Sequence, residues 1–360
     1  FILYLRSNIS GLLMFRADSI LSVLDRLLMI LICGILLWTN VAGTDFRIEW
    51  FILAQTAAYS LTALAALLIV LRRSSVRRIT LKKAFSLMIL KQSFPFAVLI
   101  LLMTFYNRID SVLLERLLPG SEGNYQAGIY ASAWRLLDAM NQIAFLFAGL
   151  LLPIFSHMIR KGDAVAPMVR MAFNMLFTLS LSVAMFSAFY SFELMDLFYR
   201  DHEEDSAAVF FILMWCFVPV ATTYVFGTLL TANGNLFYLN MVAGSGMILN
   251  ILLNVLLIPE YLALGSAMAS LVTQVVMSVA QVWLAIRYFR LKIDTGYMLR
   301  LLMFIGGVSF LAWLSVLIRW PWWIGLLVGG SLALLLSMTL RLIHIGEIRT
   351  ILRNRGEEDA

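Results

Sequence analysis

Residues 101–120 read LLMTFYNRIDSVLLERLLPG and place Asn107, Arg108 and Asp110 inside an apolar stretch. A guanidinium group suits phosphate and other anions. A carboxylate can hold an arginine or bind a cation. Charged groups within a membrane segment are costly and usually mark a functional site. The types of these side chains suit contact with a polar, anionic ligand inside a membrane.

The next apolar stretch carries a second set of polar residues. Arg135, Asp138, Asn141 and Gln142 recur at positions i, i+3, i+6 and i+7, so on a helix they share one face. At a rise of about 1.5 Å per residue, Arg108 would lie ~22 Å along the first helix and the second set would begin ~16 Å along its helix. The two sets are therefore predicted to reach similar depths on neighbouring antiparallel helices.

Two interpretations of these residues remain open. In the first, Arg108 pairs with Asp138, or Arg135 pairs with Asp110, and the pair only fastens two helices together. In the second, the side chains line a hydrated cavity and contact an anionic substrate, with Asp110 and Asp138 holding the arginines or binding a coupling cation. Both can hold at once, because a substrate can compete for an arginine.

The elements that must position these residues are membrane-spanning helices. Of the 360 residues 62% are hydrophobic and 13% are charged, whereas soluble domains are about 45–50% apolar and about 25% charged. The apolar runs do not alternate in polarity as the strands of a membrane barrel do. We predict an all-α, polytopic protein with about ten spans, at 20–40, 51–71, 93–118, 124–156, 170–199, 207–231, 236–258, 261–288, 299–318 and 322–341.

The basic residues predict the orientation of these spans. Seven Lys and Arg lie in 72–92, and further basic residues lie in 157–170, 287–300 and the tail. The alternate connections are acidic or poor in charge, so the positive-inside rule places the basic loops and the C-terminus in the cytoplasm. Segment 72–92 fits either an amphipathic surface helix joining two bundles or a solvated basic loop.

Other polar residues within the spans indicate packing. Asn250 and Asn254 lie one turn apart, and Gln274 and Gln281 lie two turns apart on the following span, so we expect interhelical hydrogen bonds between them. The two cysteines and three histidines form no metal-ligand motif. We expect no metal, no cofactor, no catalytic residue and no nucleic-acid partner.

Two longer motifs resemble the polysaccharide transporter (oligosaccharide flippase) family of the multidrug/oligosaccharidyl-lipid/polysaccharide exporter superfamily. Residues 105–158 carry R-x-D, a short loop, then G-x-Y-x-x-A-x-R and a late proline, like the seventh and eighth helices of that family. Residues 249–274 (LNILLNVLLIPEYLALGSAMASLVTQ) resemble its eleventh and twelfth helices, with Leu262 where the family usually has glycine and Ser266 where it has alanine. TANGNLFYLN (231–240) resembles the link before the eleventh helix.

The resemblance implies the C-terminal part of a fourteen-helix, two-lobe exporter. The chain begins FILYLRS, which suggests a missing N-terminal portion. The implied division is the end of the N-terminal lobe, with part of the fourth helix and the fifth and sixth (1–71), a cytoplasmic inter-lobe linker (72–92), a six-helix C-terminal lobe (93–290), two extra helices (291–341) and a cytoplasmic tail (342–360). In that family the lobes rock around a central cavity by alternating access.

The implied function is a flippase in the bacterial inner membrane that moves a polyprenyl-pyrophosphate-linked oligosaccharide for cell-surface polysaccharide synthesis. Arg108 and Arg135 would contact the anionic headgroup, and Asn107, Asn141 and Gln142 would bind sugar hydroxyls. The coupling ion would be a proton or Na⁺, and membrane lipid would surround the tail. The alternatives are a multidrug or metabolite exporter of the same superfamily, and a membrane glycan polymerase or ligase using His202 with Glu203.

Overall fold

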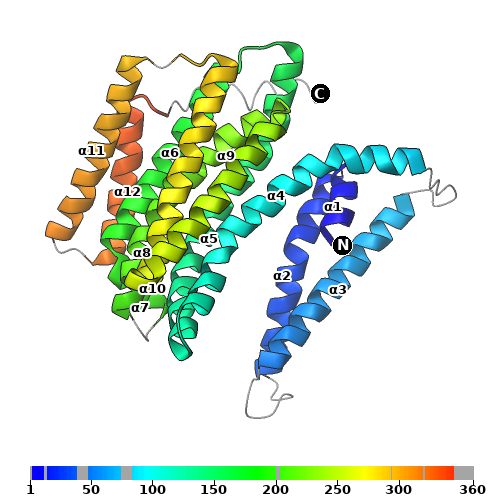
Figure 1. The fold of residues 1–360 in the computed structure, drawn as a ribbon, viewed down its shortest axis with the longest axis horizontal. Helices are drawn as coiled ribbons and strands as arrows, with labels where there is room; N and C mark the ends of the chain where they lie inside the picture. Colours follow the sequence, from blue (N-terminus) through cyan, green and yellow to red (C-terminus); the bar gives the residue numbers. More distant parts are fainter. Residues whose placement is uncertain are drawn as a thin grey trace. The chain divides into compact units, whose positions relative to one another are not determined.

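The computed structural model describes residues 2–11, 14–38, 48–73, 83–199, 203–292, 294–318 and 321–343. The regular secondary structure of these residues is helical throughout, in agreement with the predicted all-α class (Figure 1). The helices are α1 (Ile2–Gly11), α2 (Phe15–Trp38), α3 (Ile48–Arg73), α4 (Lys83–Leu117), α5 (Ser121–Lys161), α6 (Ala166–Phe189), α7 (Ser191–Phe198), α8 (Glu203–Trp215), α9 (Phe217–Ala232), α10 (Leu236–Phe289), α11 (Thr295–Leu317) and α12 (Trp322–Thr339).

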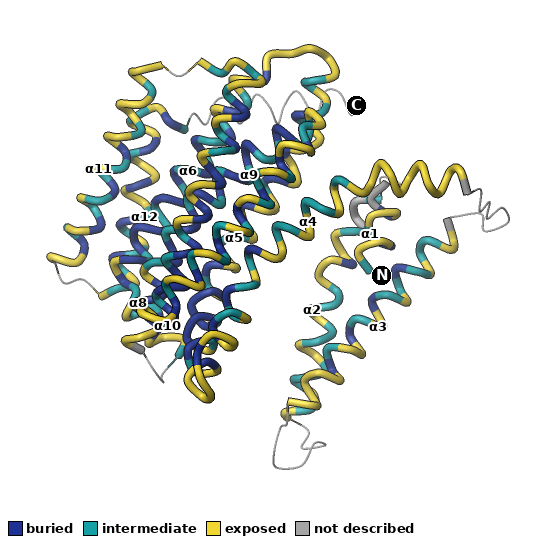
Figure 2. The backbone as a smooth tube through the Cα atoms, viewed as in Figure 1, coloured by how far each residue is buried: buried dark blue, intermediate teal, exposed yellow. Residues whose placement is uncertain are grey.

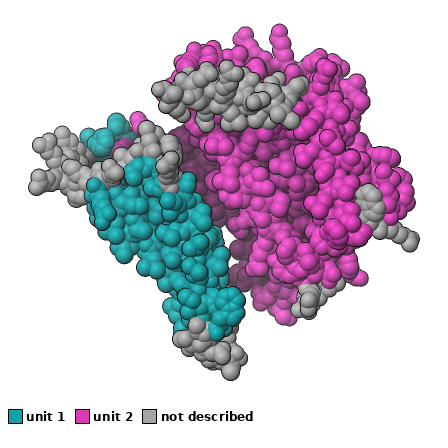
Figure 3. Space-filling model, turned by 180° about the vertical axis from the view of Figure 1, so that it is seen from behind, with its two compact units in different colours: residues 1–88 teal, residues 89–360 magenta. Residues whose placement is uncertain are grey.

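The chain divides into two compact units, residues 1–88 and 89–360, coloured separately in Figure 3. In the first unit α1, α2 and α3 pack around a small apolar core that includes Leu5 and Ile9. The division falls within the segment 72–92 that the sequence predicts as a linker. Residues 83–92 of that segment form the first turns of α4, and residues 74–82 lie outside the described residues.

Nine helical segments among the described residues are long and apolar enough to cross a membrane, with α8 and α9 forming one of them. One of the nine, α10, has 54 residues, a helical length of ~81 Å against a hydrocarbon core of about 30 Å. It cannot be a single straight crossing. The other eight segments and the two halves of α10 give the ten spans predicted from the sequence, and the chain is a multi-pass membrane protein.

The break in α10 lies at Leu262, whose φ of 54° and ψ of −132° are not helical. Pro259 comes just before it and removes a backbone donor. Ser266 Oγ donates to Asn254 Oδ1 over 2.7 Å, although twelve residues of straight helix would separate them by ~18 Å. A Cβ on Gly246 would also overlap the side chain of Met277. The two legs of α10 therefore fold back against one another as a hairpin, which the sequence predicts as two separate spans.

The interior of the second unit holds the largest core of the protein. Buried residues concentrate where α5, α8, α9 and α10 meet (Figure 2), including Phe155, Phe217 and Leu229. A second core, around Phe186 and Phe304, lies where α11 and α12 pack against α6. This arrangement leaves one long face of α4 and of α5 uncovered within the second unit, and that face carries the polar residues.

Candidate functional site

Four of the residues predicted to form a site lie on the uncovered face of α4 and α5: Arg108, Arg135, Asp138 and Gln142. We call them the polar strip. Arg108 comes from α4 and the other three from α5, at the helical spacing that the sequence shows. All four side chains are exposed. Helical periodicity alone positions them, because the opposite face of α5 packs into the main core through Leu137 and Ala144.

One ion pair joins the two helices of the strip. Arg108 Nη2 lies 3.3 Å from Asp138 Oδ2, and the two side chains are 62% and 54% exposed. This is one of the two pairings that the sequence leaves open. The other pairing does not form, because Arg135 makes no ion pair with any described acidic side chain and Asp110 lies in a different environment.

The two asparagines flank the strip and are half-buried. Asn107 Oδ1 accepts a hydrogen bond from Gln274 Nε2 over 3.0 Å, which ties α4 to the second leg of α10. Asn141 Oδ1 is buried without a hydrogen-bond partner among the described residues. A buried amide oxygen without a partner loses the hydrogen bonds it had to water. Asn141 thus retains the capacity to accept a hydrogen bond at the edge of the strip.

The strip must face water or other protein in the membrane. Placing an arginine or aspartate in hydrocarbon costs from about 2.5 kcal/mol on insertion scales to over 10 kcal/mol in simulations. Arg108, Arg135 and Asp138 lie within the segments Ala84–Leu117 and Ser121–Lys161, both of which can span a bilayer. Placed in the middle of such a segment, these charges would need water or a polar partner beside them. Their exposure is physically reasonable if a hydrated space adjoins this face of the second unit.

Asp110 lies apart from the strip and is completely buried. Its Oδ2 accepts hydrogen bonds from Tyr130 Oη over 2.7 Å and from Ser270 Oγ over 2.5 Å. Its Oδ1 accepts one from Asn254 Nδ2 over 2.8 Å. No described basic side chain pairs with it, so the carboxyl group is held entirely by neutral donors from α5 and both legs of α10.

The hydrogen bonds continue beyond this first ring of donors. Asn254 Oδ1 accepts from Ser266 Oγ, and Asn254 Nδ2 also lies 3.2 Å from Asn250 Oδ1. Asn250 Nδ2 is buried without a partner among the described residues. We call Asp110, Tyr130, Asn250, Asn254, Ser266 and Ser270 the Asp110 cluster.

The sequence predicts hydrogen bonds from Asn250 and Asn254 to Gln274 and Gln281, and this is not what the structure shows. Asn254 bonds instead to Asp110 and Ser266, and Gln274 bonds to Asn107. The spacing of polar residues along the two legs of α10 could have predicted the meeting of Asn254 with Asp110 and Ser266. Asn250 and Asn254 are spaced i, i+4 on one leg of α10, as are Ser266 and Ser270 on the other. Two polar stripes on the legs of one hairpin must face each other or a third polar group, because the surrounding faces are apolar.

The chemistry available to the cluster is that of a buried carboxyl group among hydroxyl and amide oxygens. An ionised carboxylate without a charged partner is costly in a low-dielectric interior. Such a site gains stability from a proton or from a small cation, and oxygen ligands of this kind suit hard cations. Over the described part of the chain there is no group of three or more His, Cys, Asp and Glu residues that could hold a metal ion.

Comparison with known proteins supports a shared fold. Residues 1–159 match the family model described as "Polysaccharide biosynthesis protein". No curated protein matches the chain. A solved structure titled "Lipid II flippase MurJ, inward closed conformation" superposes with a TM-score of 0.65 at 12% sequence identity, over 88% of this chain and 66% of that chain. The present chain thus spans just under two thirds of the length of that protein, and the likeness concerns the fold. The match over residues 1–159 agrees with the resemblance to polysaccharide transporters that the helix motif at 105–158 indicated.

Proposed function

We propose that the chain is part of a flippase that moves a lipid-linked oligosaccharide of the polyprenyl-pyrophosphate type across the bacterial inner membrane by alternating access. The observation that carries this proposal is the exposed polar strip on two membrane-spanning helices, with Arg108 and Arg135 at its centre. The family of residues 1–159 and the likeness of the fold to a lipid II flippase both favour a lipid-linked substrate.

In this proposal the two arginines bind the charged headgroup. Their guanidinium groups suit pyrophosphate because each presents a planar set of donors. Asp138 holds Arg108 in the absence of substrate, and the pyrophosphate competes for the same donors when it enters. Asn107, Asn141 and Gln142 hydrogen-bond to sugar hydroxyls, and the unpartnered Asn141 Oδ1 is an acceptor for one of them. The polyprenyl tail stays in lipid, and translocation involves no covalent step.

The Asp110 cluster supplies coupling. A proton or Na⁺ held at the Asp110 carboxyl group would neutralise the buried charge and change the hydrogen bonds that tie α4 to α5 and α10. Loss of the ion leaves the carboxylate facing Tyr130, Ser270 and Asn254 alone. The occupancy of the cluster would thereby alter how α4 packs, and α4 carries Arg108 of the strip only two residues away.

The proposed orientation follows the charge distribution. The basic connections and the C-terminus lie in the cytoplasm, and the headgroup is loaded from that side. Residues 344–360, which include most of the tail, lie outside the described part of the chain.

The experiment is headgroup translocation by the full-length protein in reconstituted vesicles. The substrate is a polyprenyl-pyrophosphate-linked oligosaccharide with a fluorescent sugar, and a quencher that cannot cross the membrane reports the leaflet. We expect transfer of this lipid, competition by its unlabelled form, and no competition by a cationic drug. Competition by the drug alone would favour a multidrug exporter. Polymerised or ligated product, lost on His202→Ala, would favour a glycan polymerase or ligase; His202 lies outside the described residues.

A further inference from the structure

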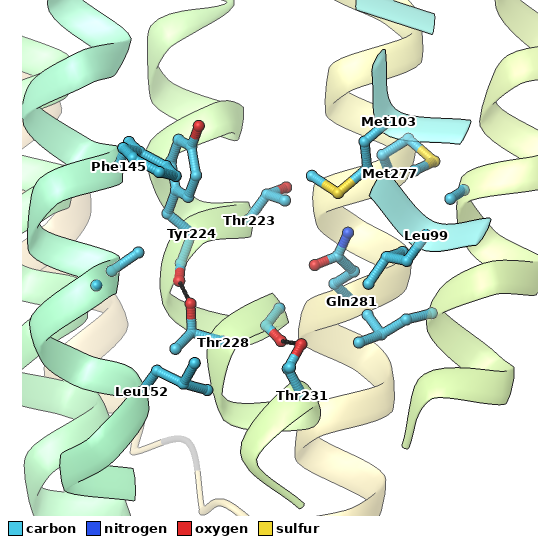
Figure 4. A pocket seen from close by; sticks show the side chains of 15 residues that line it. Leu99, Met103, Phe145, Leu152, Thr223, Tyr224, Thr228, Thr231, Met277 and Gln281 are labelled. Carbon is cyan, nitrogen blue, oxygen red and sulfur yellow. Dashed lines mark hydrogen bonds between the residues drawn. The ribbon is translucent and has the colours of Figure 1, made fainter. Parts of the chain in front are cut away.

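The second unit contains a cavity of about 380 Å³ to which α4, α5, α9 and α10 contribute lining residues (Figure 4). Its volume falls within the range typical of small-molecule sites, about 300–1,000 Å³. Leu99 and Met103 line it from α4, and Phe145 and Leu152 line it from α5. The cavity shares no residue with the polar strip or with the Asp110 cluster.

The lining is apolar and uncharged, which defines the kind of ligand that fits. None of its fifteen residues is Asp, Glu, Lys, Arg or His. A charged ligand would have no counter-charge in this environment and would lose its hydration. The ligand is therefore neutral and largely apolar.

Two polar side chains at the cavity lack hydrogen-bond partners. Gln281 is 5% exposed and Thr223 is 7% exposed. Gln281 Oε1 and Thr223 Oγ1 are both buried without a partner among the described residues. Figure 4 shows the two side chains extending into the space between α9 and the second leg of α10. Buried polar groups are nearly always paired, so each orphaned oxygen requires an explanation.

The hydroxyl groups of the other two threonines that line the cavity are hydrogen-bonded to the backbone. Thr228 Oγ1 donates to the carbonyl oxygen of Tyr224 over 2.5 Å, and Thr231 Oγ1 donates to that of Gly227 over 2.7 Å. Thr223 lies on the same helix but makes no such bond. Its hydroxyl group is thus free to contact a ligand in the cavity.

Gly227 makes room for the glutamine amide. A Cβ at this position would lie 2.5 Å from Gln281 Oε1 and 3.9 Å from Thr223 Cγ2. The absence of a side chain lets the amide of Gln281 reach α9. Gln281 Oε1 and the Thr223 side chain therefore both lie close to Gly227.

The cavity has an apolar edge at the exposed surface of α5. Phe145 is 54% exposed and Leu152 is 39% exposed, and both lie in the membrane-spanning segment Ser121–Lys161. This exposed edge leaves an entrance for a largely apolar ligand.

We propose that this cavity binds a neutral, mainly apolar alcohol. Its O–H group donates to Gln281 Oε1 and its oxygen accepts from the Thr223 hydroxyl, while the apolar body lies against Leu99, Met103 and Phe145. One hydroxyl group satisfies both orphaned side chains, which a hydrocarbon chain cannot do.

The test is photolabelling of the full-length protein in nanodiscs with a diazirine derivative of 1-dodecanol. The matched diazirine derivative of dodecane, which lacks the hydroxyl group, reports partition into any greasy surface. We expect the alcohol to label the cavity-lining peptides of α9 and α10 at least fivefold more than the alkane. Thr223→Val keeps the shape of the side chain, and Gln281→Leu removes the acceptor. Each should lower labelling by the alcohol to the level of the alkane.

Thr228→Val is the matched control, because its hydroxyl group is already bonded to the backbone; it should leave labelling unchanged. Melting temperature monitors folding of each variant, and Thr223→Val decides the matter if Gln281→Leu does not fold. Equal labelling by alcohol and alkane, or the same loss with Thr228→Val, would overturn the proposal. The readout requires no transport activity, so failure here is separate from failure of the proposed flippase function.

Discussion

Arg108 and Asp138 form an ion pair between α4 and α5 with a separation of 3.3 Å, and both side chains are more than half exposed. Exposed ion pairs contribute only about 0.2–1 kcal/mol to stability. That gain is smaller than the cost of placing either charge in a membrane segment. Fastening two helices together therefore does not explain why these charges are there, and contact with a ligand or with water does.

Exchanging the charges of Arg108 and Asp138 distinguishes an ion pair that only joins two helices from a pair that contacts a ligand. Arg108→Asp and Asp138→Arg should each lower translocation, because one removes a headgroup contact and the other crowds the remaining arginine. In the double variant the pair can form again in the opposite sense, so the melting temperature should return to that of the wild type. Translocation should remain at least tenfold lower, because the cation has moved from α4 to α5. Full recovery of translocation by the double variant would reduce the pair to a structural contact.

Substitutions of Asp110 should separate ion coupling from folding. Asp110→Asn keeps an oxygen acceptor for its neighbours, so we expect a folded protein whose transport no longer responds to a Na⁺ or proton gradient. Asp110→Leu leaves Tyr130, Ser270 and Asn254 without their acceptor and should cost on the order of 2 kcal/mol. Transport is measured in vesicles with each gradient imposed separately. An unchanged response to both gradients in Asp110→Asn would remove the cluster from the coupling mechanism.

Leu262 offers a test of the α10 hairpin. Its φ of 54° with ψ of −132° lies in a region that is almost restricted to glycine and costs other residues about 1–3 kcal/mol. Leu262→Gly should therefore leave the thermal stability unchanged or raise it by about 1 kcal/mol, despite the loss of a half-buried side chain. Thermal melting in detergent measures the effect.

Leu264 is the matched control for Leu262. It is half-buried against the same core but lies within the helical part of the second leg. Leu264→Gly should lower stability by about 2 kcal/mol, through lost burial and the lower helix propensity of glycine. Equal destabilisation by the two glycine substitutions would mean that Leu262 is not strained.

The packing of α12 against α6 depends on one glycine of a pair. A Cβ on Gly329 would overlap the ring of Phe186, which is buried, whereas a Cβ on Gly330 meets nothing within 4 Å. Gly329→Ala should destabilise the protein by about 1–3 kcal/mol. Gly330→Ala should be neutral or slightly stabilising because alanine favours helix. Melting temperatures of the two variants compare the positions directly, and similar values would contradict the close contact of α12 with α6.

The length of the apolar runs predicted the fold well, because each run is long enough to cross a bilayer as a helix. The ten predicted spans correspond to the described helices, including the two legs of α10. The helix breaks at Tyr190 and Cys216 were not predicted, because apolar residues continue through both positions. The backbone conformation of Leu262 was likewise not deducible from composition, since leucine itself favours a helix.

The candidate site was predictable in part. Helical spacing placed Arg135, Asp138 and Gln142 on one face, and the structure exposes all three. Spacing within one helix cannot show which residue of another helix lies opposite, so the separation of Asp110 from Arg108 was not foreseen. They are only two residues apart, which on a helix turns their side chains about 200° from one another. One consequently faces the hairpin of α10 and the other the exposed surface.

The most direct test of the account is the rate of headgroup translocation by Arg135→Gln in reconstituted vesicles, compared with wild type and with Arg116→Gln. Arg116 is an exposed arginine in the last turn of α4, away from the strip, and so controls for loss of a positive charge. We predict at least a tenfold loss for Arg135→Gln, with normal membrane insertion and melting temperature, and less than a twofold change for Arg116→Gln. Wild-type translocation by Arg135→Gln would contradict the assignment of the strip to headgroup binding.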